Sequence, residues 1–540
     1  MLRQPNYIYG PNTTLIPATI NFGEYMLQQL WKHKDNTALI NATTEERITY
    51  SGILQQSMNF AISLTRMGIR KGDTIGLISE NRFEYWGVVI GAACAGAVVS
   101  PISVGYVKGE LLHVTNISKP KYIVCSPSLY KIHAQTISSM KFVKKVILFG
   151  EEKQNGTLSY NDMVLETNGL IKNVKYEEFR CAEVAGQSDT LVVMYSSGTT
   201  GLPKGVMITH LNILTLMCSR GFADPSKALI SISPWYHAMG FAGCLNGLSN
   251  GVCFVCIPKF DIDLYLRTIE KYKVAQLTVV PPILVALCKD QTKKYDLSSV
   301  MFILSGAAPL RKDIIAAAHV KFPNLVMVMQ GYGATELTLG VLGFFPDSFR
   351  VDKIGSVGVV VPNVVLKVVD LETGKALGPN QSGELRVKGE LLMKGYVGRE
   401  RGDELDPEGF YRTGDIAYYD DDGYFYIVDR QKELIKYKGY QVPPAELEGV
   451  LLQHEGIRDA AVIGVEDRAA GELPLAFVVR QPGSNVTEKE VKDFVAERLS
   501  NPKHLRGGVR FVEEIPKTPS GKILRAKLRK MLKSSSKSKL

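Results

Sequence analysis

Short apolar runs alternate with helical patterns along the chain up to about residue 350. Residues 121–125 and 276–280 have the length and composition of buried strands, and residues 264–272 and 311–321 have the periodicity of helices. Parallel strands need a crossover that is usually a helix, so this alternation predicts layered α/β structure. A chain of 540 residues has room for more than one such unit.

The pattern changes after about residue 350. Residues 364–369 and 383–387 alternate in a strand-like way between glycine-bearing turns, which predicts a smaller β-rich subdomain. Helical and strand patterns return after Asp429 and could form a domain of their own. The expected fold is therefore α/β: a large N-terminal domain of layered sheets (1–429, of which about 350–429 are the β-rich subdomain), hinged to a small C-terminal α+β domain (430–540).

Charge and cysteine content exclude several classes of protein. The net charge of +10 comes mostly from residues 515–540, which hold nine basic residues and no acidic one, so the rest of the chain is nearly neutral. No basic surface interleaved with aromatic residues is evident, and we expect no nucleic-acid partner. The eight cysteines are scattered and lack the paired spacing of a zinc site, which favours buried thiols in a reducing compartment.

Two uncharged stretches, residues 85–107 and 228–258, could be mistaken for membrane spans. Both contain proline, glycine and polar residues, so we predict buried helix–turn–strand units and no membrane span. The N-terminus lacks the apolar segment of a signal peptide. The last three residues, Ser538, Lys539 and Leu540, match the receptor-read address for peroxisomes, so we expect the peroxisome as location and its import receptor as partner.

Residues 195–205 combine glycines, hydroxyl side chains and one lysine directly after an apolar strand. Glycines let backbone N–H groups turn toward an anion, hydroxyls add donors, and Lys204 supplies a positive charge. These features predict a phosphate-binding loop. It differs from a Walker A loop, because Gly205 follows the lysine and Pro203 disfavours a helix at this point.

A second glycine-rich segment, residues 330–336, follows another apolar run. Glu336 can hold Mg²⁺ and Tyr332 can stack on a purine, although turns of this kind are often structural. The carboxylate of Asp415, in Thr413-Gly414-Asp415, either caps a turn or accepts from a ribose hydroxyl. No HExxH pair occurs, and we expect no G-x-S-x-G nucleophile elbow, so the sequence favours neither the common metalloprotease mechanism nor the common hydrolase mechanism.

Together these segments resemble one family, the adenylate-forming enzymes that include acyl-CoA synthetases, coumarate–CoA ligases and beetle luciferases. The resemblance covers nearly the whole chain and is most specific in residues 195–206, 330–336, 411–415, 428–448 and 516–522. Residues 434–442 and 505–509 are most similar to the luciferase and coumarate–CoA ligase branch. Residues 395–400 depart from the family pattern after Gly395-Tyr396.

The resemblance implies ATP, Mg²⁺ and coenzyme A, and it implies a role for each matching residue. For ATP or AMP these residues are Ser196, Ser197, Gly198, Thr199, Thr200, Lys204, Gln330, Gly331, Tyr332, Gly333, Thr335, Asp415, Arg430, Lys432 and Gln441. The acyl pocket would include His237, Gly306, Ala307 and Leu339, Glu336 would bind Mg²⁺, and coenzyme A would contact Lys259, Lys438 and Gly439. Lys522 would stabilise charge during adenylation, His237 would contact the substrate carboxylate, and Lys436 would serve thioester formation after the small domain rotates about Asp429.

The implied reaction joins a small carboxylic acid, expected to be a medium- or long-chain fatty acid, to coenzyme A through an acyl-AMP intermediate. Leu339 aligns with a position that is serine in many beetle luciferases, and its alkyl side chain favours an aliphatic tail. The alternative function is a luciferase, which would follow the same adenylation with oxygenation and light emission. An inactive binding homologue is disfavoured, since Lys204, Glu336 and Lys522 are all present.

Overall fold

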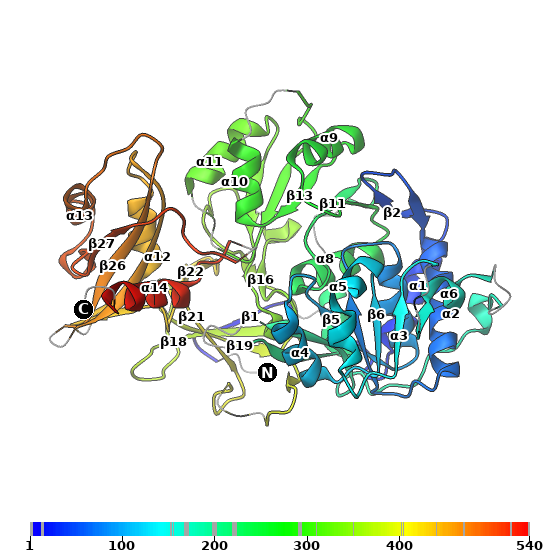
Figure 1. Ribbon diagram of the computed structural model, residues 1–540. Helices are drawn as coiled ribbons and strands as arrows, with labels where there is room; N and C mark the ends of the chain where they lie inside the picture. The colour runs from blue at the N-terminus through cyan, green and yellow to red at the C-terminus, as the bar shows by residue number, and fades with distance from the viewer. Residues whose placement is uncertain are drawn as a thin grey trace.

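The computed structural model has an α/β fold with a large N-terminal part and a small C-terminal part, as the sequence predicts (Figure 1). It describes residues 4–11, 16–151, 154, 156–166, 172–196, 202–218, 224–289, 294–308, 310, 312–348, 350–400, 402, 404–438, 440–467, 470–518 and 521–537. Among the helices that the structure describes, none is long and apolar enough to cross a membrane. Ser538, Lys539 and Leu540 lie outside the described residues.

The largest sheet has eight strands in the order β20-β10-β9-β5-β4-β6-β7-β8, and its helices lie at the right of Figure 1. Neighbouring strands from β9 to β8 run parallel, whereas β10 and β20 run antiparallel to their neighbours. The uncharged stretch from residue 85 forms the buried helix α3 and strand β5 of this layer, as predicted. The elements are β4 (Thr74–Ile78), β5 (Val98–Ile102), β6 (Tyr122–Cys125), β7 (Lys145–Leu148), β8 (Thr157–Ser159), β9 (Thr190–Ser196), β10 (Lys204–Thr209) and β20 (Gly395–Tyr396), with α1 (Phe22–Lys32), α2 (Tyr50–Arg66), α3 (Glu84–Cys94), α4 (Lys108–Ser118), α5 (Pro127–Ser138), α6 (Tyr160–Val164), the 3₁₀ turn η2 (Tyr176–Glu178) and α7 (His210–Met217).

Two smaller sheets complete the α/β part of the large domain. One has the order β11-β12-β2-β3, and the other is the parallel sheet β13-β14-β15. The carboxyl ends of β14 and β15 lead directly into Gly306 and Gly331. A second apolar cluster fills the space between these strands and the helices α9 to α11. The elements are β2 (Thr37–Asn41), β3 (Arg47–Thr49), β11 (Leu229–Ser231), α8 (Ala238–Ser249), β12 (Phe254–Cys256), α9 (Ile262–Tyr272), β13 (Gln276–Val279), α10 (Pro281–Lys289), β14 (Phe302–Ser305), α11 (Lys312–Lys321) and β15 (Met327–Gln330).

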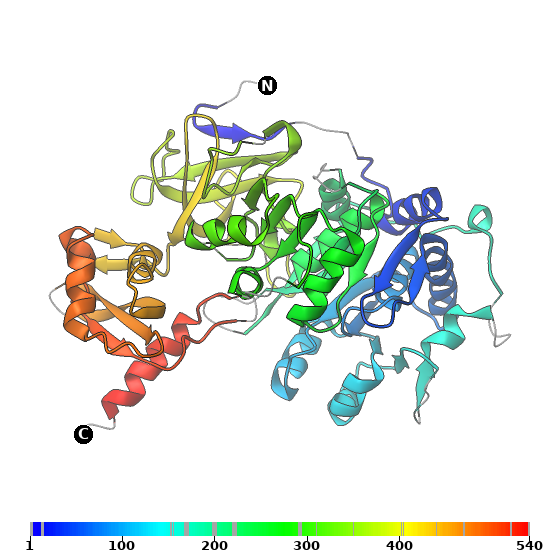
Figure 2. The same cartoon turned by 90° about the horizontal axis from the view of Figure 1, so that it is seen from above.

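The predicted β-rich region is an antiparallel sheet in the order β1-β18-β19-β21-β22. Its edge strand β1 comes from the N-terminus and lies beside β18, which the sequence patterns did not predict (Figure 2). Strand β20, in contrast, leaves this region and joins the eight-stranded sheet. The elements are β1 (Tyr7–Tyr9), η3 (Thr335–Leu337), β16 (Leu342–Gly343), η4 (Pro346–Ser348), β17 (Val359–Val360), β18 (Val364–Val369), β19 (Gly383–Gly389), β21 (Tyr411–Tyr419) and β22 (Phe425–Arg430).

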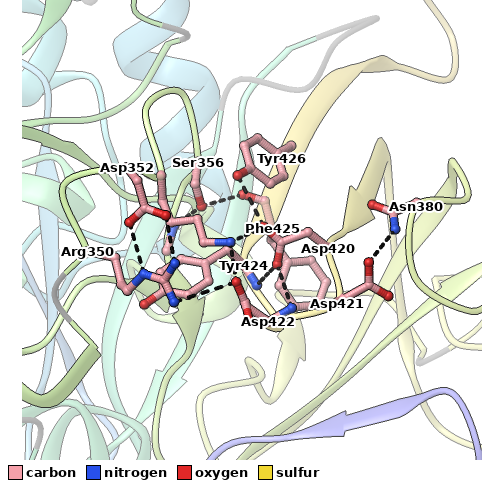
Figure 3. Close-up of polar contacts among 12 residues, drawn as sticks. Arg350, Asp352, Ser356, Asn380, Asp420, Asp421, Asp422, Tyr424, Phe425 and Tyr426 are labelled. Atoms are coloured by element: carbon pink, nitrogen blue, oxygen red, sulfur yellow. Dashed lines mark hydrogen bonds and ion pairs between the residues drawn. The ribbon is translucent and has the colours of Figure 1, made fainter.

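A polar cluster fixes the turn between β21 and β22, as Figure 3 shows. Lys353 Nζ donates to Asp420 at 2.9 Å and to Asp422 at 2.5 Å, and Arg350 pairs with Asp352 at 2.6 Å. This turn cluster (residues 350–356 and 420–426) therefore holds one end of the β21–β22 hairpin. The other end of the same hairpin carries two of the predicted site residues.

The small domain is a sheet in the order β24-β23-β26-β25, with β27 paired to β26 and helices packed on it. The segment before α14 leaves this domain and reaches the large one in both views (Figures 1 and 2). The elements are β23 (Ile435–Tyr437), β24 (Tyr440–Val442), α12 (Pro444–Leu451), β25 (Ile457–Asp467), β26 (Gly471–Arg480), α13 (Glu488–Ala496), η5 (Asn501–Lys503), β27 (Gly508–Phe511) and α14 (Arg525–Lys537).

Candidate active site

Strands β9 and β10 form a hairpin, and predicted phosphate-binding residues lie on both strands where they meet the connecting segment. Ser196, the last residue of β9, is paired in register with Lys204, the first residue of β10. Strand β10 begins directly after Pro203, so no helix starts at this point, as predicted from the sequence. Ser196 is buried, and its Oγ has no hydrogen-bond partner among the described residues, so a donor is free for an anion. The predicted residues Ser197, Gly198, Thr199 and Thr200 lie outside the described residues.

Glu336, the predicted Mg²⁺ ligand, lies in the 3₁₀ turn η3 beside this hairpin. Its Oε1 accepts a hydrogen bond from the Tyr396 hydroxyl at 2.9 Å, and the Tyr396 ring lies 4.7 Å from Lys204 Nζ. Burial, together with the Glu336 charge, raises the pKa of Tyr396, so the phenol remains a neutral donor. Tyr396 therefore holds the predicted metal ligand and the predicted phosphate-binding lysine next to each other.

Tyr332, Asp415 and Arg430 form the second part of the site. The Tyr332 hydroxyl donates to Asp415 Oδ2 at 2.6 Å, and Arg430 Nε pairs with Asp415 Oδ1 at 3.2 Å, because β21 and β22 place these two residues opposite each other. Burial raises the pKa of Asp415 although Arg430 and Tyr332 act to lower it. Gln330 Oε1 accepts from the Leu310 amide at 2.9 Å and so ties the end of β15 to the loop after β14. The predicted purine and ribose residues thus lie together.

Lys522 lies near the tip of a short hairpin, residues 516–524, that extends from the small domain. Backbone hydrogen bonds from Thr518 to Lys522 and from Leu524 to Pro516, each 2.8 Å, close this hairpin, which we call the Lys522 loop. It touches the large domain so closely that a Cβ on Gly521 would lie 2.5 Å from Pro282 Cγ. Burial and the Arg430 charge lower the pKa of Lys522, while Glu433 and Asp415 oppose that shift. The Lys522 side chain therefore lies close enough to Arg430 and Asp415 for their charges to act on its pKa.

His237 immediately precedes helix α8 as its N-cap residue. Its side chain is accessible to solvent, yet the surrounding protein lowers its pKa by desolvation, which keeps the imidazole neutral at pH 7. Met239, two residues on, lies 3.4 Å from where a Cβ on Gly306 would be. The structure thereby brings the start of α8 against Gly306 and Ala307, which are both predicted acyl-pocket residues.

Among the described residues, none covers one strip of helix α8. Met239, Gly243 and Asn246 are the residues of its central turns that are not buried, and their spacing places them on one face. A Cβ on Gly243 would meet no atom within 4 Å. Leu339 is half-buried in a tight turn with φ of +94°, and its carbonyl oxygen would lie 1.6 Å from a Cβ on Gly333. Positive φ at Leu339 and at Ala307 (+72°) marks backbone strain near the site.

Four of the lysines predicted as site residues lie apart from the residues around Asp415. Lys436 and Lys438 lie on the exposed hairpin β23–β24, where the Lys436 amide donates to Glu472 Oε2 at 2.8 Å. Lys432 is exposed after Arg430, and Lys259 is exposed beyond β12. Among the described contacts, none joins these four side chains to the residues around Asp415. Gly439 and the side chain of Gln441 lie outside the described residues.

Sequence reasoning missed three features of the site. In the sequence, Tyr396 stands at the start of a segment that departs from the family pattern. Gly243 is one of several glycines in an apolar stretch, and Arg525 is one of the basic residues of the C-terminal tail. Residues 247–251 also spell the G-x-S-x-G pattern of a nucleophile elbow. Ser249, however, is buried at the end of α8 and donates to the Asn246 carbonyl at 2.8 Å, so no strand-to-helix elbow forms there.

Comparison with known proteins agrees with this geometry. Residues 27–397 match the family model of the AMP-binding enzymes, and residues 446–522 match the model of the AMP-binding enzyme C-terminal domain. The chain is 39% identical to the luciferin 4-monooxygenase of Photuris pensylvanica over all of both chains. It is also 39% identical to 4-coumarate–CoA ligase 1 of Petroselinum crispum, over 96% of this chain and 95% of that protein. The chain therefore belongs to the AMP-binding enzyme family.

The solved structure of ATP-bound MatB from Rhodopseudomonas palustris has a TM-score of 0.82 at 28% identity, covering 94% of this chain and 98% of that one. The apo form of the same protein covers the same shares with a TM-score of 0.73. The fold, the family and the adenylate-forming chemistry predicted from the sequence are thus confirmed, whereas luciferases and ligases match the chain equally well.

Proposed function

We propose that this protein is an ATP- and Mg²⁺-dependent ligase that joins an aliphatic carboxylic acid to coenzyme A through an acyl-AMP intermediate. The observation that carries the proposal is the convergence of Lys522, Asp415 and Arg430, from two domains, on one side of the nucleotide-binding residues. A carboxylate is a poor acyl donor, and adenylation supplies a leaving group, so a thiol can attack without a protein nucleophile. Lys522 stabilises the charge that develops at the α-phosphate.

Mg²⁺ fits the residues around Glu336. This ion keeps several waters and is usually held by one or two carboxylates together with substrate phosphates. One Glu336 oxygen is occupied by Tyr396, and the described residues contain no group of three or more metal-ligating side chains, so a phosphate-bridged ion suits the site. Mg²⁺ would neutralise phosphate charge, while Lys204 and Ser196 bind the phosphates. His237, as a neutral imidazole, orients the acid carboxylate.

The acid that suits the pocket is a medium- or long-chain fatty acid. The strip along α8 begins next to His237 and continues past Gly243, which leaves room for an extended chain. Met239 and Leu339 offer apolar surface and no hydroxyl, so a polyhydroxylated or heteroaromatic acid finds no polar partner in these two side chains.

The alternative, a luciferase, shares the adenylation step and is favoured by the 39% identity to the Photuris protein. The deciding experiment measures ATP- and CoA-dependent consumption of C6 to C20 fatty acids, cinnamates and beetle luciferin, with light recorded in the same wells. Acyl-CoA from fatty acids without light supports the ligase. Light with any acid moves the protein to the luciferase class, and turnover of cinnamates alone rejects the aliphatic pocket.

A substitution on α8 tests the acyl pocket directly. Gly243→Leu fills the open strip, so long acids should lose activity by about tenfold while the shortest acids that react are spared. Gly109→Leu is the matched control, because Gly109 also lies in a helix with nothing within 4 Å of its Cβ position, but on α4. An equal loss at every chain length would reject the strip as the acyl site.

The proposed location is the peroxisome, and the proposed partner is its import receptor. This rests on Ser538, Lys539 and Leu540 alone, as a receptor-read tripeptide. A fluorescent protein fused in front of this chain should enter peroxisomes, and removal of the three residues should leave it in the cytosol. Import that persists without them would reject the assignment.

A further inference from the structure

A buried ionic cluster lies behind the Lys522 loop, at the start of α14. Arg525 donates from Nη1 to Glu433 and from Nη2 to Glu448, both at 2.7 Å, and from Nε to the Val462 carbonyl at 3.2 Å. The Arg525 side chain is only 9% exposed and Glu448 is 11% exposed. The guanidinium therefore has fixed partners on three sides, which is the geometry that its planar fork suits.

The three partners come from different parts of the small domain. Glu433 lies in the turn directly after Arg430, Glu448 lies on helix α12, and Val462 lies on strand β25. Glu448 Oε1 also accepts from the Val462 amide at 2.8 Å. The cluster thus joins the segment next to the predicted hinge to Arg525, the residue that directly follows the Lys522 loop.

Electrostatic stabilisation alone does not explain the presence of this buried ionic cluster. Burial raises the pKa of Glu448 to about 7, against the Arg525 guanidinium and the Val462 amide, so ionising this carboxyl in the domain interior is costly. Buried ion pairs are often no more stabilising than apolar residues of the same volume, but they fix geometry. The side chain that benefits from fixed geometry here is Lys522, whose loop leaves the domain body at Arg525.

We propose that Arg525 is a positioning residue for adenylation: by holding Glu433 and Glu448, it fixes the base of the Lys522 loop relative to the hinge segment. The inference deepens the proposed function and rests on the proposed role of Lys522. Lys436 lies on a different hairpin, and no described hydrogen bond or ion pair joins its side chain to this cluster. Loss of Arg525 should therefore slow acyl-AMP formation and spare thioester formation from supplied acyl-AMP.

The test compares both half-reactions and the melting temperature in wild type and four variants. Arg525→Met/Glu448→Gln removes the guanidinium together with the Glu448 carboxylate, leaves Glu433 unchanged, and keeps an acceptor for the Val462 amide. Arg525→Lys keeps the positive charge without the planar fork. Lys503→Met is the matched control, because Lys503 pairs with Glu446 on the same helix α12 at 2.6 Å, away from the Lys522 loop. Lys522→Ala and wild type complete the set.

We expect the double variant to melt close to wild type, to form acyl-AMP at least about tenfold more slowly, and to retain thioester formation. Arg525→Lys should fall between the two, and Lys503→Met should match wild type. Equal losses in both half-reactions, or normal adenylation in the double variant while Lys522→Ala is inactive, would overturn the inference. Normal adenylation in Lys522→Ala would instead reject the proposed role of Lys522.

Discussion

The Lys522 loop and the β23–β24 hairpin both present a lysine from the small domain, but they lie in opposite environments. The Lys522 loop is packed against Pro282, and burial lowers the pKa of its lysine. Lys436 and Lys438 are exposed, and no described contact joins their side chains to the large domain. One surface of the small domain is therefore docked, and the other is in solvent.

This difference indicates a division of labour in time. Of the lysines on these two surfaces, Lys522 is the one whose charge acts on Asp415, the residue proposed to bind the nucleotide ribose, and this holds for the described part of the chain. For Lys436 to act on the same intermediate, the small domain must turn about the segment near Asp429, as the family resemblance implies. Variants on each surface, assayed separately for acyl-AMP formation and for thioester formation, test whether the two surfaces serve separate half-reactions.

The largest effect is expected from Lys522→Ala. The variant removes the charge next to the α-phosphate, so acyl-AMP formation should fall by about 100- to 1,000-fold. Thioester formation from supplied acyl-AMP should remain close to wild type. Pyrophosphate release and CoA-thioester formation, measured separately, check both statements, and loss of both half-reactions would remove the division between the surfaces.

Lys436→Ala should give the opposite result. Adenylation should be unchanged, because Lys436 is far from the docked surface, while thioester formation from acyl-AMP should fall by about 100-fold through lost positioning of coenzyme A. The accumulation of enzyme-bound acyl-AMP in the presence of coenzyme A is the direct readout. A variant that fails first in adenylation would contradict the assignment.

Gly521→Ala tests the docked surface alone, because the added methyl group would collide with Pro282 only when the Lys522 loop is docked. The added Cβ would meet Pro282 Cγ at 2.5 Å when the loop is docked, whereas the strain of φ near +86° is present in both states. Adenylation should fall by about tenfold with thioester formation retained. If Pro282→Ala, in the same chain, restores part of the adenylation rate, the contact is confirmed as the cause.

Part of this arrangement follows from the sequence, and the reasons for the rest are physical. The apolar runs at 276–280 and 364–369 form β13 and β18, as predicted. Buried strands can be predicted because their apolar content and alternation lie within one short stretch of sequence. Tyr396 could not be assigned in this way, since its contact with Glu336 joins residues 60 positions apart. Arg525 belongs to a run of basic residues, and only packing against Glu433 and Glu448 distinguishes it from its solvated neighbours.

The pH dependence of the two half-reactions should differ in sign. Lys522 must be protonated to stabilise the phosphate charge, and its pKa lies below the usual 10.5. Adenylation should therefore decline as pH rises through that lowered value, at lower pH than an ordinary lysine requires. Thioester formation from supplied acyl-AMP should instead rise in the alkaline range, as the coenzyme A thiol ionises. Parallel profiles of initial rates would contradict the difference between the two surfaces.

The smallest effect is expected from Lys353→Ala, which lies outside both surfaces. The substitution removes the ion pairs from Lys353 to Asp420 and Asp422, and solvent screens both pairs, so the free energy of unfolding should fall only slightly. The far end of the β21–β22 hairpin is also held by β19 and by the Asp415–Arg430 pair. Both half-reactions should therefore keep their wild-type rates at temperatures where the variant is folded. A selective loss of adenylation would show that the turn cluster, too, sets the geometry around Asp415.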